Sequence, residues 1–127
     1  MVILPMFSFQ RLIRSFVDAW RGMVHVYRKE QNFRIQVGAS LLILIAIIFL
    51  PLRTWEIVVL ILLVVMVLTM EILNTALENF SDLFKPRVHP YVGVVKDLMA
   101  GSVLITALGA LIVGSIILLP HFLGLFK

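Results

Sequence analysis

The sequence contains no cysteine and little charge. Without cysteine it has no disulfide, no thiolate metal site and no cysteine nucleophile. Only 14% of its 127 residues are charged, whereas 61% are hydrophobic, and the mean hydropathy is +1.09. A soluble domain is typically about 25% charged and about 45–50% apolar. A soluble domain this small would have too little polar surface to cover its core, so the composition predicts a membrane protein.

The sequence also lacks a charged segment ahead of its first apolar residues. Met1 to Met6 is apolar with no basic residue before it, so we expect no cleavable signal peptide. Positive charge instead precedes the first long apolar run. No nucleic-acid recognition motif accompanies it, so attraction to anionic lipid head groups is preferred and no nucleic acid partner is expected. Six of the eleven Lys and Arg residues contribute: Arg11, Arg14, Arg21, Arg28, Lys29 and Arg34.

Residues 7–28 repeat apolar side chains at helical spacing, with basic side chains largely between them. A helix with a basic face and an aromatic-rich apolar face is typical of the membrane interface, although packing against a soluble partner would give the same pattern. We therefore predict an N-terminal amphipathic surface helix here. Arg11 and Trp20 on this helix, and Arg34 after it, are candidates for contact with a lipid substrate or the interface.

Three further segments are apolar and long enough to cross a membrane, which takes about 20 helical residues. Pro51 and Arg53 mark a short turn after the first, and Pro86 and Pro90 make residues 85–90 a loop. The sequence thus predicts an all-α membrane protein forming one domain over residues 1–127, with spans over about residues 35–52, 55–80 and 94–119.

The distribution of Lys and Arg predicts the orientation. They are concentrated in the N-terminal arm and at Lys85, Arg87 and Lys96, whereas the opposite side has only Arg53 and Lys127. Because Lys and Arg are enriched on the cytoplasmic side, we expect a cytoplasmic N-terminus and an external C-terminus. The protein would be a multi-pass protein of the bacterial inner (cell) membrane.

Ionisable residues from three separate segments are predicted to lie at one level, near the cytoplasmic boundary of the bilayer. At the helical rise, Glu71 lies roughly 24 Å and Glu78 roughly 34 Å inward from Trp55 at the outer surface. The same count of helical rise along the first and third spans places their ionisable residues at a similar depth. The residues concerned are Glu30, Arg34, Glu71, Glu78, Lys96 and Asp97.

Glu71, Asn74 and Glu78 share one helix face, with the Thr75 hydroxyl on the same side. Carboxylates in a span are costly and usually mark function. Two carboxylates on one face repel each other unless a cation lies between them, and Mg²⁺ suits such ligands together with substrate phosphates. Lys96 can bind phosphate. Alternatively, Asn74 could only join helices, and Glu78 and Lys96 could form a structural ion pair.

Motifs of soluble kinases are absent. Gly109 and Gly114 have the glycine spacing of a P-loop, but Ser115 follows where a lysine is needed, so the stretch is interpreted as helix packing. The histidines do not form a metal-ligand set, and His121 is expected among the outer head groups. A nucleotide site, if there is one, would be built from helix ends.

The polar motifs resemble those of the small prokaryotic integral-membrane diacylglycerol kinases, including Gram-positive relatives that phosphorylate undecaprenol. The resemblance covers nearly the whole chain. The run of glutamate, asparagine and glutamate joined to a downstream Lys-Asp is a specific signal. The matching segments are Glu30-Gln-Asn-Phe-Arg34, Glu71-Ile-Leu-Asn-Thr-Ala-Leu-Glu78 with Asp82, His89-Pro90, and Lys96-Asp97 followed by Ala100-Gly101.

The resemblance implies an ATP-dependent lipid kinase that acts on a membrane lipid alcohol as a homotrimer, with sites shared between protomers. Glu71 would be the general base that accepts the proton of the lipid hydroxyl. Glu30 and Glu78 would hold Mg²⁺ or a similar divalent cation bridging the ATP phosphates. The resemblance also implies nucleotide-binding roles for Asn74, Asp82, His89, Lys96 and Asp97.

Some positions depart from the family pattern. Gly93 and Val94 stand where a basic residue is frequent, Gln36 where Gram-positive members often have histidine, and Arg87 where Gram-negative members have an acidic residue. These departures bear on nucleotide affinity and base preference more than on the chemistry.

The form Asn74-Thr75-Ala76 and the pair His89-Pro90 favour undecaprenol as the acceptor, with diacylglycerol as the alternative. A channel or scaffold subunit without enzymatic activity is the alternative from another class. A lipid phosphatase is disfavoured because no nucleophile constellation is present.

Overall fold

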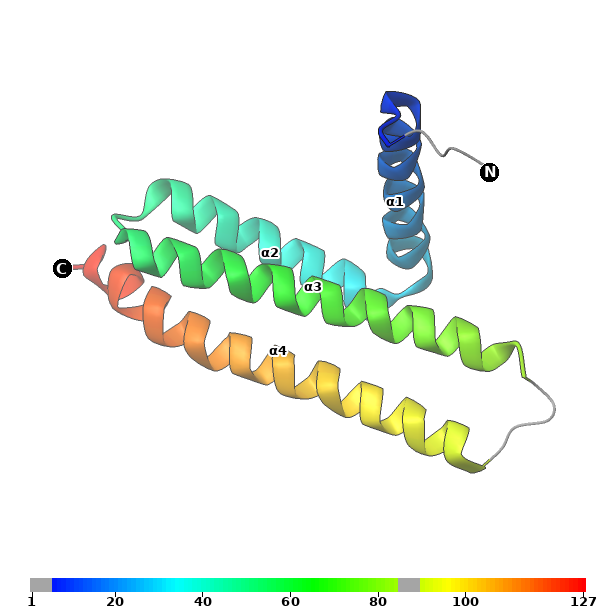
Figure 1. The fold of residues 1–127 in the computed structure, drawn as a ribbon. Helices are drawn as coiled ribbons and strands as arrows, with labels where there is room; N and C mark the ends of the chain where they lie inside the picture. Colours follow the sequence, from blue (N-terminus) through cyan, green and yellow to red (C-terminus); the bar gives the residue numbers. More distant parts are fainter. Residues whose placement is uncertain (1–5, 85–89) are drawn as a thin grey trace.

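The computed structural model describes residues 6–84 and 90–127. The described chain is helical, with one helix standing apart from a bundle of three (Figure 1). The three bundle helices are long and apolar enough to cross a membrane, which confirms the predicted all-α class and the three candidate spans. The helices are α1 (Phe9–Lys29), α2 (Gln31–Phe49), α3 (Thr54–Asp82) and α4 (Pro90–Gly124).

The break between α1 and α2 falls at Glu30. Its backbone is extended, with φ −110° and ψ 117°, so one residue ends α1 and begins α2. The Arg34 side chain reaches back across this break, and its guanidinium donates to the carbonyls of Tyr27 at 2.9 Å and Arg28 at 3.0 Å. These carbonyls have no partner within α1 because they lie in its last turn. Arg34, predicted as a substrate or interface contact, therefore holds the α1–α2 corner.

The observed ends of α2 and α4 differ from the predicted ends of the first and third spans, and the differences fall next to prolines. The first span was predicted to reach residue 52, but α2 ends at Phe49, because a residue before proline disfavours helical geometry and Leu50 is extended. The third span was predicted as 94–119, but α4 is longer at both ends. Pro90, predicted as loop, is its first residue, where a missing N–H costs nothing. Pro120 lies inside α4.

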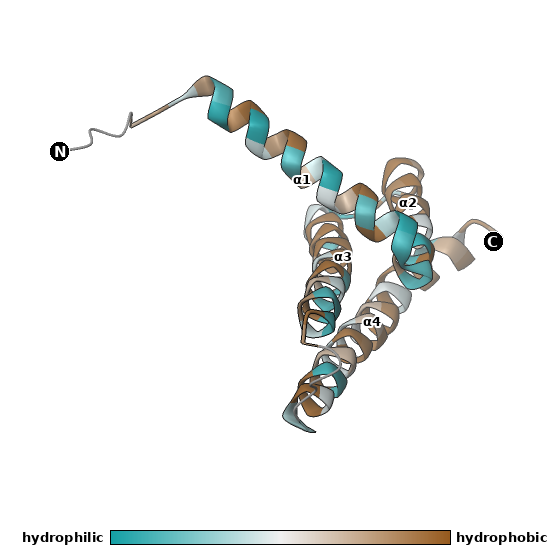
Figure 2. Ribbon diagram, turned by 90° about the vertical axis from the view of Figure 1, so that its right-hand side faces the viewer, coloured by the Kyte–Doolittle hydropathy of each residue, from teal (hydrophilic) through white to brown (hydrophobic). Residues whose placement is uncertain are grey.

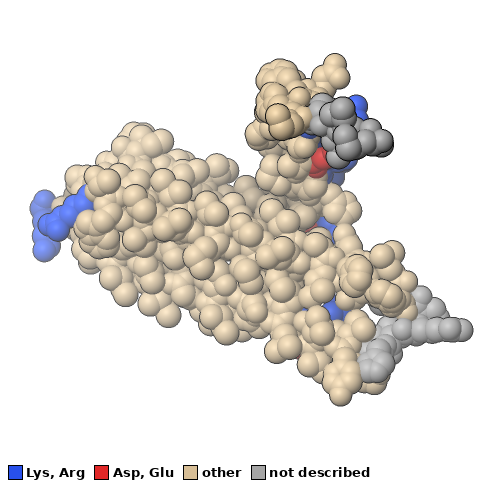
Figure 3. All heavy atoms as spheres, viewed as in Figure 1, with Lys and Arg blue, Asp and Glu red and all other residues tan. Residues whose placement is uncertain are grey.

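Within the bundle, α3 lies between α2 and α4 and packs against both (Figure 1). The described chain buries few apolar side chains, whereas many large ones on the three spans are exposed. Figure 3 shows that the visible sides of the bundle are almost free of Lys, Arg, Asp and Glu. Such surfaces suit lipid tails or further copies of the chain. The buried apolar residues are Val26, Phe33, Leu60 and Ile117.

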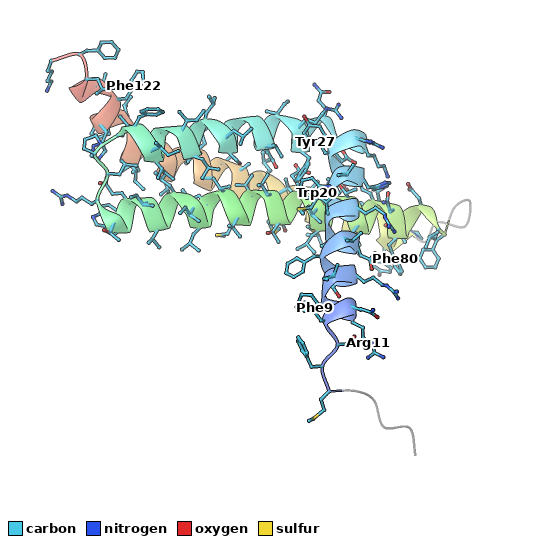
Figure 4. The ribbon with its side chains drawn as sticks, turned by 90° about the horizontal axis from the view of Figure 1, so that it is seen from above. Phe9, Arg11, Trp20, Tyr27, Phe80 and Phe122 are labelled. Atoms are coloured by element: carbon cyan, nitrogen blue, oxygen red, sulfur yellow. The ribbon has the colours of Figure 1, made fainter. Side chains whose placement is uncertain are left out.

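Ser8 caps the start of α1, because its hydroxyl accepts a hydrogen bond from the Arg11 backbone N–H at 3.4 Å. Polar and apolar residues alternate along α1 (Figure 2), and Phe9 and Arg11 extend from opposite sides of it (Figure 4). Trp20 is 67% exposed. Helix α1 meets the bundle at its C-terminal end, where it contacts α2 and α3 (Figure 1).

Candidate functional site

Glu71 lies inside the bundle on α3 and is only 2% exposed. Its carboxylate accepts a hydrogen bond from Gln36 of α2, with 3.3 Å between Nε2 and Oε1. Glu30 and Glu78 are close enough to interact with it electrostatically. A nearly enclosed carboxylate held by one neutral donor is suited to accept a proton from a hydroxyl group.

Two buried polar atoms near Glu71 have no hydrogen-bond partner among the described residues: Gln36 Oε1 and Thr75 Oγ1. Thr75 lies one turn beyond Glu71 on the same helix and is 1% exposed. A buried polar group without a partner costs about 1–3 kcal/mol, so native structures rarely keep one without a reason. These atoms indicate a place where a polar group from outside the described chain can bind.

Glu30 and Glu78 come together although they are 48 positions apart in the sequence. Burial raises the pKa of the Glu30 carboxyl above its usual value, and Glu78 raises it further through its charge and a side-chain hydrogen bond. Lys29 and Arg34 act in the opposite direction. Two carboxyl groups this close repel each other when both are charged, and a divalent cation can join them instead.

The pair fits a cation that also takes ligands from a substrate. In the described chain no group of three or more His, Cys, Asp or Glu side chains could hold a metal ion alone. Mg²⁺ does not require one, since it is commonly held by one or two carboxylates and completes its shell with phosphate oxygens and water. Asn74 donates its amide to Glu78, with 3.5 Å between Nδ2 and Oε1, so it lies beside the pair.

Two of the remaining predicted nucleotide contacts, Lys96 and Asp97, make no polar contact with this pair among the described residues. Lys96 and Asp97 lie in the first turns of α4, and their side chains make no hydrogen bond or ion pair within the part of the chain that the structure describes. The alternative ion pair between Glu78 and Lys96 is therefore not formed there. Asp82 is the last residue of α3, and His89 lies outside the described residues.

Four contacts between helices were not predicted from the sequence. Gln36 was noted only as a departure from the family pattern, and the structure places it against Glu71. Asn79 joins α3 to Lys29 and His25 of α1. At the opposite end of the bundle, His121 was expected among the outer head groups. Its Nε2 instead lies 3.0 and 3.2 Å from the carboxylate oxygens of buried Glu56.

The fold and these contacts define a polytopic membrane protein with a carboxylate-rich site at one end of its spans. The sequence profile of the prokaryotic diacylglycerol kinases matches residues 17–118. The chain therefore belongs to the prokaryotic diacylglycerol kinase family, whose members are lipid kinases.

Curated relatives of the chain are named for two different lipid acceptors, diacylglycerol and undecaprenol. A diacylglycerol kinase of Synechocystis sp. is 37% identical over 115 residues, which cover 90% of this chain and 66% of the relative. An undecaprenol kinase of Bacillus subtilis is 36% identical over 110 residues, covering 87% of this chain and 89% of the relative. A diacylglycerol kinase of Escherichia coli is 32% identical over 115 residues, covering 91% and 94%.

Proposed function

We propose that this protein is an ATP-dependent lipid kinase that phosphorylates undecaprenol, yielding undecaprenyl phosphate and ADP. The observation that carries the proposal is the juxtaposition of buried Glu71 with the carboxyl pair Glu30 and Glu78. One carboxylate is available to take a proton, and the other two can hold the cation that accompanies ATP. Phosphoryl transfer needs little more from a protein than such positioning and charge neutralisation.

In the proposed reaction the Glu71 carboxylate removes the proton of the lipid hydroxyl as its oxygen attacks the γ-phosphorus of ATP. The bond between the γ-phosphorus and the β–γ bridging oxygen breaks, and ADP leaves. Gln36 keeps the Glu71 carboxylate oriented through its hydrogen bond. Glu30 and Glu78 would hold Mg²⁺, which when bound neutralises charge on the phosphates. Asn74 orients Glu78.

The hydrocarbon tail of the acceptor has room next to this site. A cavity of about 540 Å³ lies between α2, α3 and α4, and Gln36 is part of its wall. Apart from Gln36 and two serines, Ser40 and Ser115, its lining is apolar. A lipid whose hydroxyl lies at Glu71 could therefore extend its tail along the same groove, in surroundings that resemble the bilayer.

The assembly and the membrane orientation belong to the same proposal. We propose a homotrimer in which a neighbouring copy brings Lys96 and Asp97 to the phosphates, because their side chains have no polar partner in the described part of their own chain. Asp82 and His89 would contact the nucleoside. The exposed apolar sides of the spans support association of copies. The amphipathic α1 would lie on the cytoplasmic surface of the cell membrane, with the C-terminus external.

The acceptor assignment rests on two supports. The Asn74-Thr75-Ala76 form favours it, and the undecaprenol kinase relative aligns over 89% of its own length. Diacylglycerol is the second candidate, because the Synechocystis and Escherichia coli relatives are named for it. Phosphorylation of the two lipids by the purified protein, compared side by side, tests both the kinase and its acceptor.

A further inference from the structure

Asn79 joins α3 to two residues of α1. Its side-chain Oδ1 accepts a hydrogen bond from the Lys29 ammonium group, and its Nδ2 lies 3.4 Å from Nε2 of His25. His25 and Lys29 are four residues apart, so they lie on the same face of α1. The oxygen and the nitrogen of the Asn79 amide thus both contact the same face of α1.

The donor and acceptor roles of the atoms in this link agree with one another. An amide oxygen accepts and an amide nitrogen donates, so His25 accepts at Nε2 in the tautomer whose proton is on Nδ1. The apolar attachment of α1 is small, because Val26 is its only buried residue in the described range. Figure 4 shows α1 crossing α3 at this end of the bundle. The polar link therefore makes up much of what fixes the end of α1 to α3, whereas the Arg34 hydrogen bonds join it to α2.

The residues of this link are the sequence neighbours of the carboxyl pair. Lys29 immediately precedes Glu30, and Asn79 immediately follows Glu78. Glu30 itself lies at the extended break between two helices, so its position depends on how the end of α1 is held. Two carboxylates repel each other, and without the Asn79 link the end of α1 is joined to α2 but, in the described chain, has no polar attachment to α3 that keeps Glu30 beside Glu78.

We propose that Asn79, through Lys29 and His25, is a positioning residue that keeps Glu30 against Glu78 and so sets the affinity of the site for a divalent cation. This inference rests on the proposed function for its cation site. It predicts that breaking the link weakens cation binding roughly tenfold, the lower end of what outer partners of metal ligands contribute. The chemistry at saturating cation should be little changed.

The test replaces Asn79 with leucine, which has a similar size and no polar atoms. Binding of Mn²⁺ is measured by electron paramagnetic resonance on the purified protein, with the non-hydrolysable ATP analogue AMP-PNP held constant. Lipid phosphorylation is then measured across a Mg²⁺ titration. We expect Asn79→Leu and Lys29→Met to need roughly tenfold more cation while kcat at saturating Mg²⁺ stays within about twofold.

Two further variants separate positioning from general effects. Lys29→Arg keeps a donor for Asn79 and should retain the wild-type requirement for cation. Arg14→Met removes a charge from exposed α1 without touching the link, so it should also behave as wild type. The double variant Lys29→Met with Asn79→Leu should be no worse than either single variant, because both remove one contact.

The outcomes distinguish this inference from the proposed function. If the wild type binds Mn²⁺ and Asn79→Leu binds it equally well, the positioning role is overturned and the kinase proposal is untouched. Weaker Mn²⁺ binding by Asn79→Leu in a protein that phosphorylates neither lipid would support the link and overturn the kinase proposal. A wild type that binds no Mn²⁺ overturns the link and the cation site together.

Discussion

Gln36 of α2 donates a hydrogen bond from Nε2 to the carboxylate of Glu71 on α3, with 3.3 Å between Nε2 and Oε1. This contact joins two spans inside the bundle and leaves Gln36 Oε1 without a partner among the described residues. It presents Glu71 with a donor that carries no charge. The carboxylate is thereby oriented without an adjacent cation that would make it a weaker base.

Replacing Glu71 with glutamine should reduce kcat by roughly 10²- to 10⁴-fold, the usual contribution of a general base. Glutamine keeps the shape of the side chain and can still bond to Gln36, so folding and nucleotide binding should be nearly unchanged. The measurement is lipid phosphorylation beside nucleotide binding on the same preparation. Wild-type turnover by Glu71→Gln would exclude Glu71 as the base.

Loss of Gln36 should lower kcat without affecting the requirement for cation. Leucine removes the donor to Glu71, and a hydrogen bond to a charged group is worth about 1.5–3 kcal/mol, which corresponds to roughly 10- to 100-fold in rate. Gln36→His keeps a donor and should lose less activity. Steady-state kinetics of the two variants provide the comparison, and equal losses in both would mean that the hydrogen bond is unimportant.

Glu30→Gln and Glu78→Gln should each raise the Mg²⁺ concentration needed for half-maximal activity by roughly tenfold or more. Each variant removes one charge of the pair but leaves the side-chain volume. Asp18→Asn removes a carboxylate from exposed α1 and serves as the control. A Glu78→Gln protein that melts at a lower temperature yet has an unchanged Mg²⁺ requirement would assign Glu78 a structural role instead.

Filling the cavity between the spans should impair use of the lipid and spare ATP. Ala107 lies in the cavity wall, so Ala107→Phe should raise the apparent KM for the lipid severalfold with little change in the KM for ATP. Ile105→Phe adds a ring on the exposed side of the same helix and should be neutral. If both variants have the same lipid kinetics, the tail does not occupy this groove.

The helical content and the spans were predictable from the sequence because long apolar runs have few alternatives. The common face of Glu71, Asn74 and Glu78 follows from helical spacing alone, and Asn74 does lie beside Glu78. From the residues themselves, Glu30 and Glu78 were expected only at a similar depth, and only the family resemblance implied that they share a metal ion. It depends on the backbone break at Glu30, which no periodicity marks.

Contacts between helices that are distant in sequence were not predictable. Asn79 with Lys29, and Glu56 with His121, pair only because particular faces of two helices pack together. Neither pair has a motif or spacing that indicates it. The start of α4 was missed for a local reason, since Pro90 was interpreted as a helix breaker although a first helical position accommodates proline.

Transfer of the labelled γ-phosphoryl group of ATP to lipid by the purified protein in mixed micelles tests the central claim most directly. Undecaprenol and diacylglycerol would be offered separately at equal mole fraction, with Mg²⁺ present and Glu71→Gln as the control for a contaminating kinase. We predict labelled lipid from both acceptors, a higher kcat/KM for undecaprenol, and almost no label with Glu71→Gln. Equal or higher kcat/KM for diacylglycerol would contradict the undecaprenol assignment, and no labelled lipid from either acceptor would contradict the kinase itself.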